Sequence, residues 1–235
     1  NPSTRHSRGI KFMKTKIISY SQAPMEDALH KHSALDLIAY CARVSNPSNQ
    51  TNKETNEKLV KYLMKHKHWS PLEMVSVCME IETTRDIARQ LLRHRSFSFQ
   101  EFSQRYADPT TDLAFEIREA RLQDPKNRQN SIPTDNGLLQ HAWADMQQKV
   151  IDTALDAYNY ALSKGIAKEQ ARVVLPEGNT LSRLYVNGTL RSWIHYIELR
   201  GANGTQLEHM ELAHAVADVI SKVFPLAEEF KGKEI

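Results

Sequence analysis

A cationic triplet, Arg93-His94-Arg95, is the feature of this sequence with the clearest chemistry. It lies in the segment LLRHRSFSFQEFSQRY, residues 91–106, among aromatic side chains and serines. A guanidinium is a rigid, permanently charged fork that binds phosphates through two parallel hydrogen bonds and stacks on flat, electron-rich rings. The triplet therefore indicates a binding site for an anionic or aromatic ligand.

Three polar residues follow the triplet at alternate positions: Glu101, Ser103 and Arg105. Side chains two residues apart lie on the same face of an extended chain, so a strand here would present all three together. They would offer an acceptor, a small hydroxyl group and a cation. Such a set suits a ligand that carries both a sugar and a phosphate.

Histidine pairs make a metal site the first alternative, but their spacing is poor. His66 and His68 form H-x-H, and His209 and His214 are five residues apart. The zinc-binding pair of an H-E-x-x-H helix is four residues apart, which places both ligands on one face. With ten histidines in the chain, close pairs arise by chance. We predict no metal site and interpret His209 and His214 as solvated or core-edge residues.

A serine nucleophile is the second alternative, because Ser96, Ser98 and Ser103 all lie near His94. No G-x-S-x-G elbow accompanies them. Attack by a serine also requires a positioned base and a third group that orients this base. A hydrogen bond from Ser103 to a substrate is the favoured interpretation, and a nucleophilic Ser103 stays open.

Single-stranded nucleic acid is the third alternative. Arginines and aromatic residues interleave over 93–106, which would suit stacked bases and phosphates, and GANG at 201–204 matches the GXXG of a KH domain. Both patterns are common, however, and Glu101 would repel a phosphate backbone. We predict that no nucleic-acid polymer is a partner.

The composition fits one domain of 235 residues with a net charge of +3. So mild a charge excludes a protein whose whole surface binds polyanions. Cys41 and Cys78 form no C-x-x-C pair and are too few for a disulfide scaffold, which predicts a reducing compartment. No apolar run approaches the ~20 residues that span a bilayer. A soluble, cytoplasmic protein without a membrane partner is therefore predicted.

Glycine is scarce, and none lies between residues 10 and 136. A P-loop and a G-x-G-x-x-G dinucleotide fold both need glycines where the backbone approaches a phosphate. Both folds are excluded over this part of the chain. A nucleotide bound here must be held largely by side chains.

Hydrophobic periodicity predicts the elements that position these residues. Residues 1–12 are polar and basic, and we interpret them as a leader or an expression remnant before a single domain at 13–235. Strands are predicted at 13–21 and, with strict alternation, at 73–84. A helix over 84–95 would end at the cationic triplet.

Further helices are predicted elsewhere, and the segment 107–136 is predicted to be extended chain and polar loop. In the longest helix, Trp143, Met146, Val150, Ala154, Leu155 and Tyr158 form one apolar stripe. These elements predict an α+β fold, a small, mainly antiparallel sheet surrounded by helices. The predicted helical segments are 34–45, 53–66, 137–164, 167–176, 190–200 and one that begins near 206.

The segment RHRSFSFQEFS fits R-H-R, then seven residues, then S, and in this it resembles the flavin-dependent thymidylate synthases. EFSQRY continues the family pattern with Glu101, Ser103, Arg105 and Tyr106. The resemblance covers most of the chain from Met13 onward. The other similar segments, in family order, are ARVS at 42–45, YLMKHKHWSPLE at 62–73, ARQLLRHR at 88–95, ARVVLP at 171–176 and LRSWIHYIELR at 190–200.

The resemblance implies a methyltransferase that converts dUMP to dTMP. Methylenetetrahydrofolate would give the methylene group, and NADPH would supply the reducing electrons through a bound FAD, which carries the difficult chemistry. It also implies a homotetramer whose active sites are shared among subunits, and no attack on the uracil ring by an enzyme thiol or hydroxyl. A flavoprotein of another specificity stays open as an alternative.

The resemblance also implies roles for individual residues. Arg93 and Arg200 occupy the places of catalytic residues, and His68 is also placed near the folate. Gly204 stands where some members of the family have a flavin-contacting histidine. The residues at cofactor places are Ser45, His68, Ser70, Arg93, His94, Arg95, Glu101, Asn187, Arg191 and His195. The residues at dUMP places are Gln90, Arg93, Glu101, Phe102, Ser103, Arg105, Arg172 and Arg200.

Overall fold

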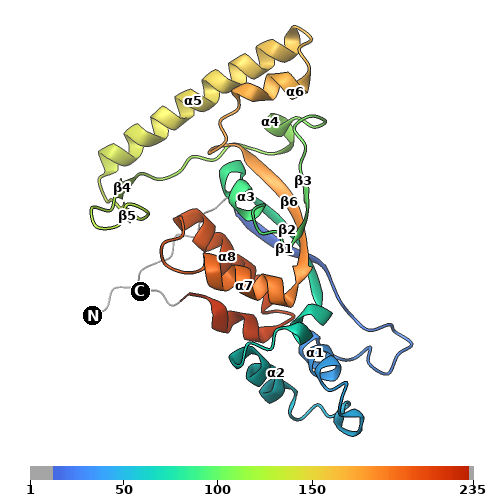
Figure 1. Ribbon diagram of the computed structural model, residues 1–235. Coiled ribbons are helices and arrows are strands. Elements are labelled where there is room, and N and C mark those ends of the chain that lie inside the picture. The colour runs from blue at the N-terminus through green and yellow to red at the C-terminus, as the bar shows by residue number, and fades with distance from the viewer. Residues whose placement is uncertain (1–12, 233–235) are drawn as a thin grey trace.

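A four-stranded sheet forms the centre of the computed structural model, which describes residues 13–232 (Figure 1). Each neighbouring pair of strands is antiparallel. The strands predicted at 13–21 and 73–84 are confirmed, whereas the leader predicted at 1–12 lies outside the described residues. The order across the sheet is β1 (Lys14–Tyr20), β2 (Ser76–Thr84), β6 (Leu181–Thr189) and β3 (Ser98–Glu101).

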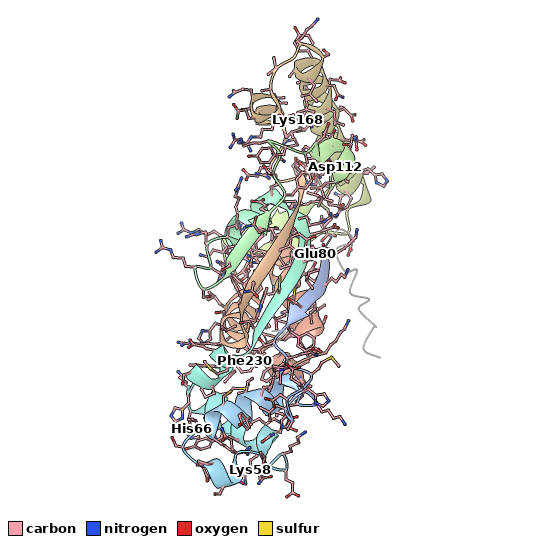
Figure 2. The ribbon with its side chains drawn as sticks, turned by 90° about the vertical axis from the view of Figure 1, so that its right-hand side faces the viewer. Lys58, His66, Glu80, Asp112, Lys168 and Phe230 are labelled. Carbon is pink, nitrogen blue, oxygen red and sulfur yellow. The ribbon has the colours of Figure 1, made fainter. Side chains whose placement is uncertain are left out.

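The sheet has one apolar and one polar face because its strands alternate. Val77, Met79 and Ile81 of β2 are fully buried on the apolar face. The polar face carries Glu80, which hydrogen-bonds Tyr185 at 2.8 Å, and Figure 2 shows this face with its strands in full view. The helices that cover the apolar face are α3 (Arg85–Leu91), α7 (Leu190–Arg200) and α8 (Leu207–Ile220).

The other elements gather at the two ends of the sheet, so the molecule is elongated (Figure 1). One end holds α1 (Ala34–Ala42), η1 (Pro47–Asn49), α2 (Asn56–Lys65), η2 (Ser70–Met74) and η4 (Pro225–Phe230). The opposite end holds α4 (Pro109–Asp112), the hairpin β4 (Arg121–Gln123) and β5 (Ser131–Pro133), α5 (Gly137–Ser163), α6 (Lys168–Ala171) and η3 (Arg172–Val174). The predicted α+β class is confirmed, with helices over one face and both ends of an antiparallel sheet.

Two glutamine side chains bond the long helix α5 to the segment at residues 118–120. Gln147 Oε1 accepts the N–H of Arg118 at 2.9 Å, and Gln147 Nε2 donates to the Arg118 carbonyl at 2.7 Å. Gln140 makes the same pair of bonds with Ala120, at 2.7 and 2.9 Å. Each amide pairs with the backbone as a neighbouring strand would, which fixes α5 against residues 118–120.

The apolar stripe predicted along α5 is present, but only its second half is buried. Tyr158 is fully buried and packs with Ala171 in a small cluster separate from the main core. Trp143, Met146 and Val150 are 46%, 53% and 53% exposed, because no described element covers them. With residues 118–122 they line an open apolar pocket of about 690 Å³.

Strand β6 is the main element that the sequence analysis missed. Its inward-facing residues are Ser182, Leu184, Val186 and Gly188. Two of these four are a serine and a glycine, and Asn-Gly is a strong turn signal, so the period of two is hidden. The segment 107–136 also holds more structure than predicted, namely α4 and the β4–β5 hairpin.

None of the helices within residues 13–232 has the length and apolar character that crossing a membrane requires.

Candidate active site

The cationic triplet lies in a turn and not, as predicted, at the end of a helix. Helix α3 ends at Leu91, and the N–H of His94 donates to the Leu91 carbonyl at 3.0 Å. Both ends of the turn are anchored, because Leu91 is fully buried and Phe97 is 7% exposed. The Phe97 ring lies against Gly188, where a Cβ atom would overlap it. A continued helix would carry Phe97 away from this contact, so the helix ends early.

His94 accepts a hydrogen bond from Arg200. The Arg200 Nε–H donates to His94 Nε2 at 3.0 Å, and a guanidinium can only donate. His94 therefore carries its proton on Nδ1. Burial, together with the charges of Arg200 and Arg93, lowers the pKa of His94 to about 4. At neutral pH the Nδ1–H is thus a fixed donor that can point to a ligand.

Arg93 and Arg95 extend from this turn into solvent. Both are exposed, and neither has an ion-pair partner within residues 13–232. Free guanidinium groups keep all of their donors for an incoming anion. The turn thus combines two free cations with one neutral imidazole donor.

Glu101, at the end of β3, is held by three side chains. Ser182 Oγ donates to Glu101 Oε1 at 2.8 Å. The guanidinium groups of Arg85 and Arg89 lie 3.5 and 3.8 Å from its carboxylate oxygens. Two cations therefore compensate its charge while leaving lone pairs for a ligand. Sequence reasoning missed Arg85 and Ser182, although the spacing of Arg85 and Arg89 by four residues on α3 was a usable signal.

Ser103 and Arg105 do not share a strand face with Glu101, so that prediction is wrong. The last sheet contact is the Phe102 N–H, which donates to the Arg183 carbonyl at 2.8 Å. The chain then turns, and the Ser103 carbonyl accepts the N–H of Tyr106 at 3.1 Å. Strand β6 continues for three residues beyond Leu184, the partner of Glu101, so the turn takes Ser103 and Arg105 out of the sheet before the partner strand ends.

Arg105 and Arg172 meet around one glutamate of α6. Arg105 Nη2 lies 3.2 Å from Glu169 Oε2, and Arg172 Nε donates to the Glu169 carbonyl at 3.3 Å. Two predicted phosphate-binding arginines, 67 residues apart in the sequence, are thus brought to one place. Ser103 Oγ accepts the N–H of Arg105 at 3.4 Å and is bonded to no histidine among the described residues.

His68 follows a strained helix end. The His68 N–H donates to the Leu63 carbonyl at 2.8 Å, and the Lys67 N–H donates to the Met64 carbonyl at 3.1 Å, which is a Schellman motif after α2. Lys67 has φ of 59°, a backbone conformation that favours glycine. The strain turns the chain sharply and leaves His68 exposed beside η2.

Four of the other predicted flavin residues lie on η2, β6 and α7. His195 packs edge-on against Trp69, with ring centroids 4.7 Å apart. Arg191 Nη1 bonds Glu73 Oε1 at 2.5 Å. Asn187 pairs in register with Ser98, just beyond the cationic turn. Ser45 and Ser70 are exposed, after α1 and at the start of η2 respectively.

In the described part of the chain, the predicted site residues thus fall into two linked pairs and a third group that is bonded to neither pair. The structure joins His94 to Arg200, and it joins Arg105 to Arg172. No hydrogen bond or ion pair within 13–232 links Ser45, His68 or Ser70 to either group. Within residues 13–232 the predicted site residues thus lie in separate groups.

The two C-terminal histidines have separate partners. His209 Nδ1 lies 3.1 Å from Gln90 Oε1, and His214 Nε2 lies 3.1 Å from the Gly201 carbonyl oxygen. In the described part of the chain, no group of three or more histidines, cysteines or acidic residues is arranged to hold a metal ion.

Comparison with known protein families decides which chemistry this arrangement serves. A sequence model of the family described as thymidylate synthase complementing protein matches residues 28–226. The chain belongs to this family. Flavin-dependent thymidylate synthase, the family predicted from the R-H-R-x7-S pattern, is thereby confirmed, as is its activity, the methylation of dUMP to dTMP.

Relatives within this thymidylate synthase family match nearly the whole chain. A probable flavin-dependent thymidylate synthase of Paramecium bursaria Chlorella virus 1 is 49% identical, over 91% of this chain and 96% of the viral protein. A flavin-dependent thymidylate synthase of Synechocystis is also 49% identical, over 80% of this chain and 85% of its own length. Among solved structures, a UMP/dUMP methylase, PolB from Streptomyces cacaoi, bound with 5-Br dUMP, has a TM-score of 0.76 and 25% identity over 92% of this chain and 93% of its own.

Proposed function

We propose that this thymidylate synthase uses FAD as its flavin, methylenetetrahydrofolate as methylene donor and NADPH as reductant, in a homotetramer with shared active sites. The observation that carries the proposal is the anchored turn, which presents Arg93, Arg95 and the neutral His94 side by side. Their chemistry fits a cofactor that has a diphosphate and a flat ring with hydrogen-bonding edges.

The flavin would be held by the cationic turn and by the polar residues near η2 and α7. The exposed guanidinium groups of Arg93 and Arg95 suit its diphosphate, and the Nδ1–H of His94 suits a ring acceptor. When bound, the flavin supplies the redox chemistry of the reaction. The protein's part is to orient it and to keep the nearby imidazole neutral. The remaining proposed flavin residues are Ser45, His68, Ser70, Glu101, Asn187, Arg191 and His195.

The nucleotide would be held by the groups around α3, β3 and α6. Arg105 and Arg172, which already converge on Glu169, suit the phosphate of dUMP. Glu101 accepts hydrogen bonds, Ser103 both donates and accepts them, and Gln90 offers both kinds of group on α3. Phe102 lies between Glu101 and Ser103 and completes this wall of the proposed site.

Arg200 and Arg93 are the proposed catalytic residues. Arg200 uses its Nε–H on His94 and keeps its remaining N–H groups free to stabilise negative charge on the uracil ring. Arg93 lies one residue from His94 and would contact both ligands. No nucleophilic thiol or hydroxyl of the protein is required in this proposal.

Self-association would complete the site. The first half of α5 exposes Trp143, Met146 and Val150 along an open apolar pocket, on a helix that stands apart from the sheet (Figure 1). Apolar surfaces of this kind commonly mark protein interfaces. A second copy of the chain would cover this face and would bring the separate residue groups of different subunits together.

The test is a spectrum followed by an assay. The purified protein should be yellow, or become yellow with added FAD, and it should consume NADPH and form dTMP only when dUMP and methylenetetrahydrofolate are both present. A colourless protein that takes up no FAD would refute the proposed cofactor, and a yellow protein that forms no dTMP would favour a flavoprotein of another specificity. A parallel reaction with UMP tests the one further substrate that the PolB name suggests.

A further inference from the structure

A chain of partly buried hydrogen bonds connects Gln90 to the start of α8. His209 Nδ1 and Gln90 Oε1 are 3.1 Å apart. Gln90 Nε2 donates to Gln206 Oε1 at 2.8 Å, and Gln206 Nε2 donates to Glu208 Oε2 at 3.0 Å. Arg121 Nη2 donates to the other oxygen of Glu208. Glu208 is 1% exposed and His209 is 0% exposed, so water competes little at these two ends of the chain.

The direction of this chain is fixed by its charged end. An ionised carboxylate only accepts hydrogen bonds, so Gln206 must turn its amide NH₂ toward Glu208. The Gln206 carbonyl oxygen then faces Gln90, which must donate a hydrogen bond from its own NH₂ group. The Gln90 carbonyl oxygen consequently faces His209. Reversing either amide would set two acceptors against each other in a partly buried place, where an unmade hydrogen bond is costly.

The same logic fixes the proton on His209. Because Gln90 presents an oxygen, the ring nitrogen that faces it, Nδ1, must carry the hydrogen. Burial, with the nearby charges of Arg200 and His94, lowers the pKa of His209 to about 3, so the ring is neutral and has only one N–H. Nε2 then keeps a lone pair, and this atom has no hydrogen-bond partner within residues 13–232.

We propose that His209, Gln206 and Glu208 are positioning residues that hold the Gln90 amide in one orientation for the nucleotide. This inference rests on the proposed role of Gln90 in the dUMP site. With its orientation fixed, the Gln90 amide keeps one N–H donor and one carbonyl lone pair that the hydrogen-bond chain does not use. A pyrimidine edge whose acceptor and donor match this N–H and this lone pair can bind. An edge with the reverse pattern would place its donor against the N–H of Gln90.

The first test reads the proton directly. We would label the wild-type holoenzyme with ¹⁵N-histidine and record long-range ¹H–¹⁵N correlation spectra at neutral pH, assigning His209 by its absence from the spectrum of His209→Asn. A neutral ring with its proton on Nδ1 is expected. A proton on Nε2, or a doubly protonated ring, would overturn the inference without any variant having to be active.

The second test separates positioning from folding. His209→Phe keeps a buried ring but removes the donor, and the KM for dUMP should rise by about tenfold, the upper range for one hydrogen bond. His209→Asn, whose amide can donate from near the position of Nδ1, should restore KM to within about twofold. A variant that merely folds less well lowers Vmax and leaves KM unchanged, and that result for His209→Phe would overturn the inference.

A matched pair addresses the charged end. Glu208→Gln lets the amide chain run in either direction, so the spectrum of His209 should gain an Nε2–H form. Glu119→Gln removes the other carboxylate near Arg121, at 3.6 Å, and should change neither the spectrum nor KM. If the wild-type enzyme binds no dUMP, the proposed function is wrong. If wild type and His209→Phe both bind dUMP normally, only the positioning role is wrong.

Discussion

One fully buried and one partly buried histidine should make this protein lose stability in mild acid. His209 and His94 have pKa values lowered to about 3 and about 4 by burial and by neighbouring cations. In an unfolded chain both return to the ordinary value of 6.5. Below that pH the unfolded state binds more protons than the folded state. The free energy of unfolding must therefore fall as the pH drops from about 6.5 toward 4.

The size of the effect follows from the same values. At pH 5 the unfolded chain gains about 2 kcal/mol per histidine from protonation, since 1.5 pKa units at ~1.4 kcal/mol each separate 6.5 from 5. The fully buried His209 should give nearly all of this amount, and His94, which keeps some contact with water, should give less. Carboxylates with lowered pKa, such as Glu208 and Asp36, lose their contribution only in more acid solution. Glu116, whose pKa is raised by burial, acts weakly in the opposite direction.

The assay is urea unfolding followed by tryptophan fluorescence, at pH 7.5 and 5.0 and at one protein concentration. Wild type should lose about 3 kcal/mol over this interval, and His209→Asn should lose about 2 kcal/mol less, because the variant cannot titrate there. Parallel losses in the two proteins would show that His209 is not held neutral, and the reasoning would fail.

Three substitutions test the site and its support. Arg93→Ala should reduce both flavin retention, measured as the visible to ultraviolet absorbance ratio, and dUMP affinity, because it removes a charged donor shared by two ligands; wild-type values would refute the role. Ser103→Ala should weaken dUMP binding by about tenfold yet keep measurable turnover, since one hydrogen bond is lost. Complete loss of turnover with intact binding would instead indicate a nucleophile. Gln147→Leu should lower the free energy of unfolding by about 2–4 kcal/mol, because both backbone groups of Arg118 lose their partner, whereas the neighbouring Gln148→Leu should change it little.

The fold was predictable where one residue pattern decides one element. In β2 the alternation of Val77, Met79 and Ile81 with polar residues predicts both the strand and its buried face. In β6 the inward positions include Ser182, which hydrogen-bonds Glu101, and Gly188, which lies against the Phe97 ring, and neither has a large apolar side chain. Pattern alone cannot detect a strand whose buried face is shaped by partners elsewhere in the chain.

The site was predictable where its residues are neighbours in sequence. The triplet at 93–95 and the family resemblance give the residues proposed for the flavin and the nucleotide, but not the groups that hold those residues. Arg85 and Ser182 reach Glu101 from other elements, and Ser182 lies 81 residues away from it. The turn after Phe102 was missed because the alternation of Glu101, Ser103 and Arg105 continues through it and so predicts extended chain.

The anchored turn has a consequence for the cost of binding. Leu91 and Phe97 secure its two ends before any ligand arrives. The backbone that carries Arg93 and Arg95 is thus already ordered, and only their side-chain rotamers remain to be restricted. That restriction costs about 0.5–1.5 kcal/mol per side chain, whereas ordering a free loop would add about 1–2 kcal/mol for each backbone residue. Affinity for the two proposed ligands would therefore depend in part on the hydrophobic contacts of Leu91 and Phe97, which touch neither ligand.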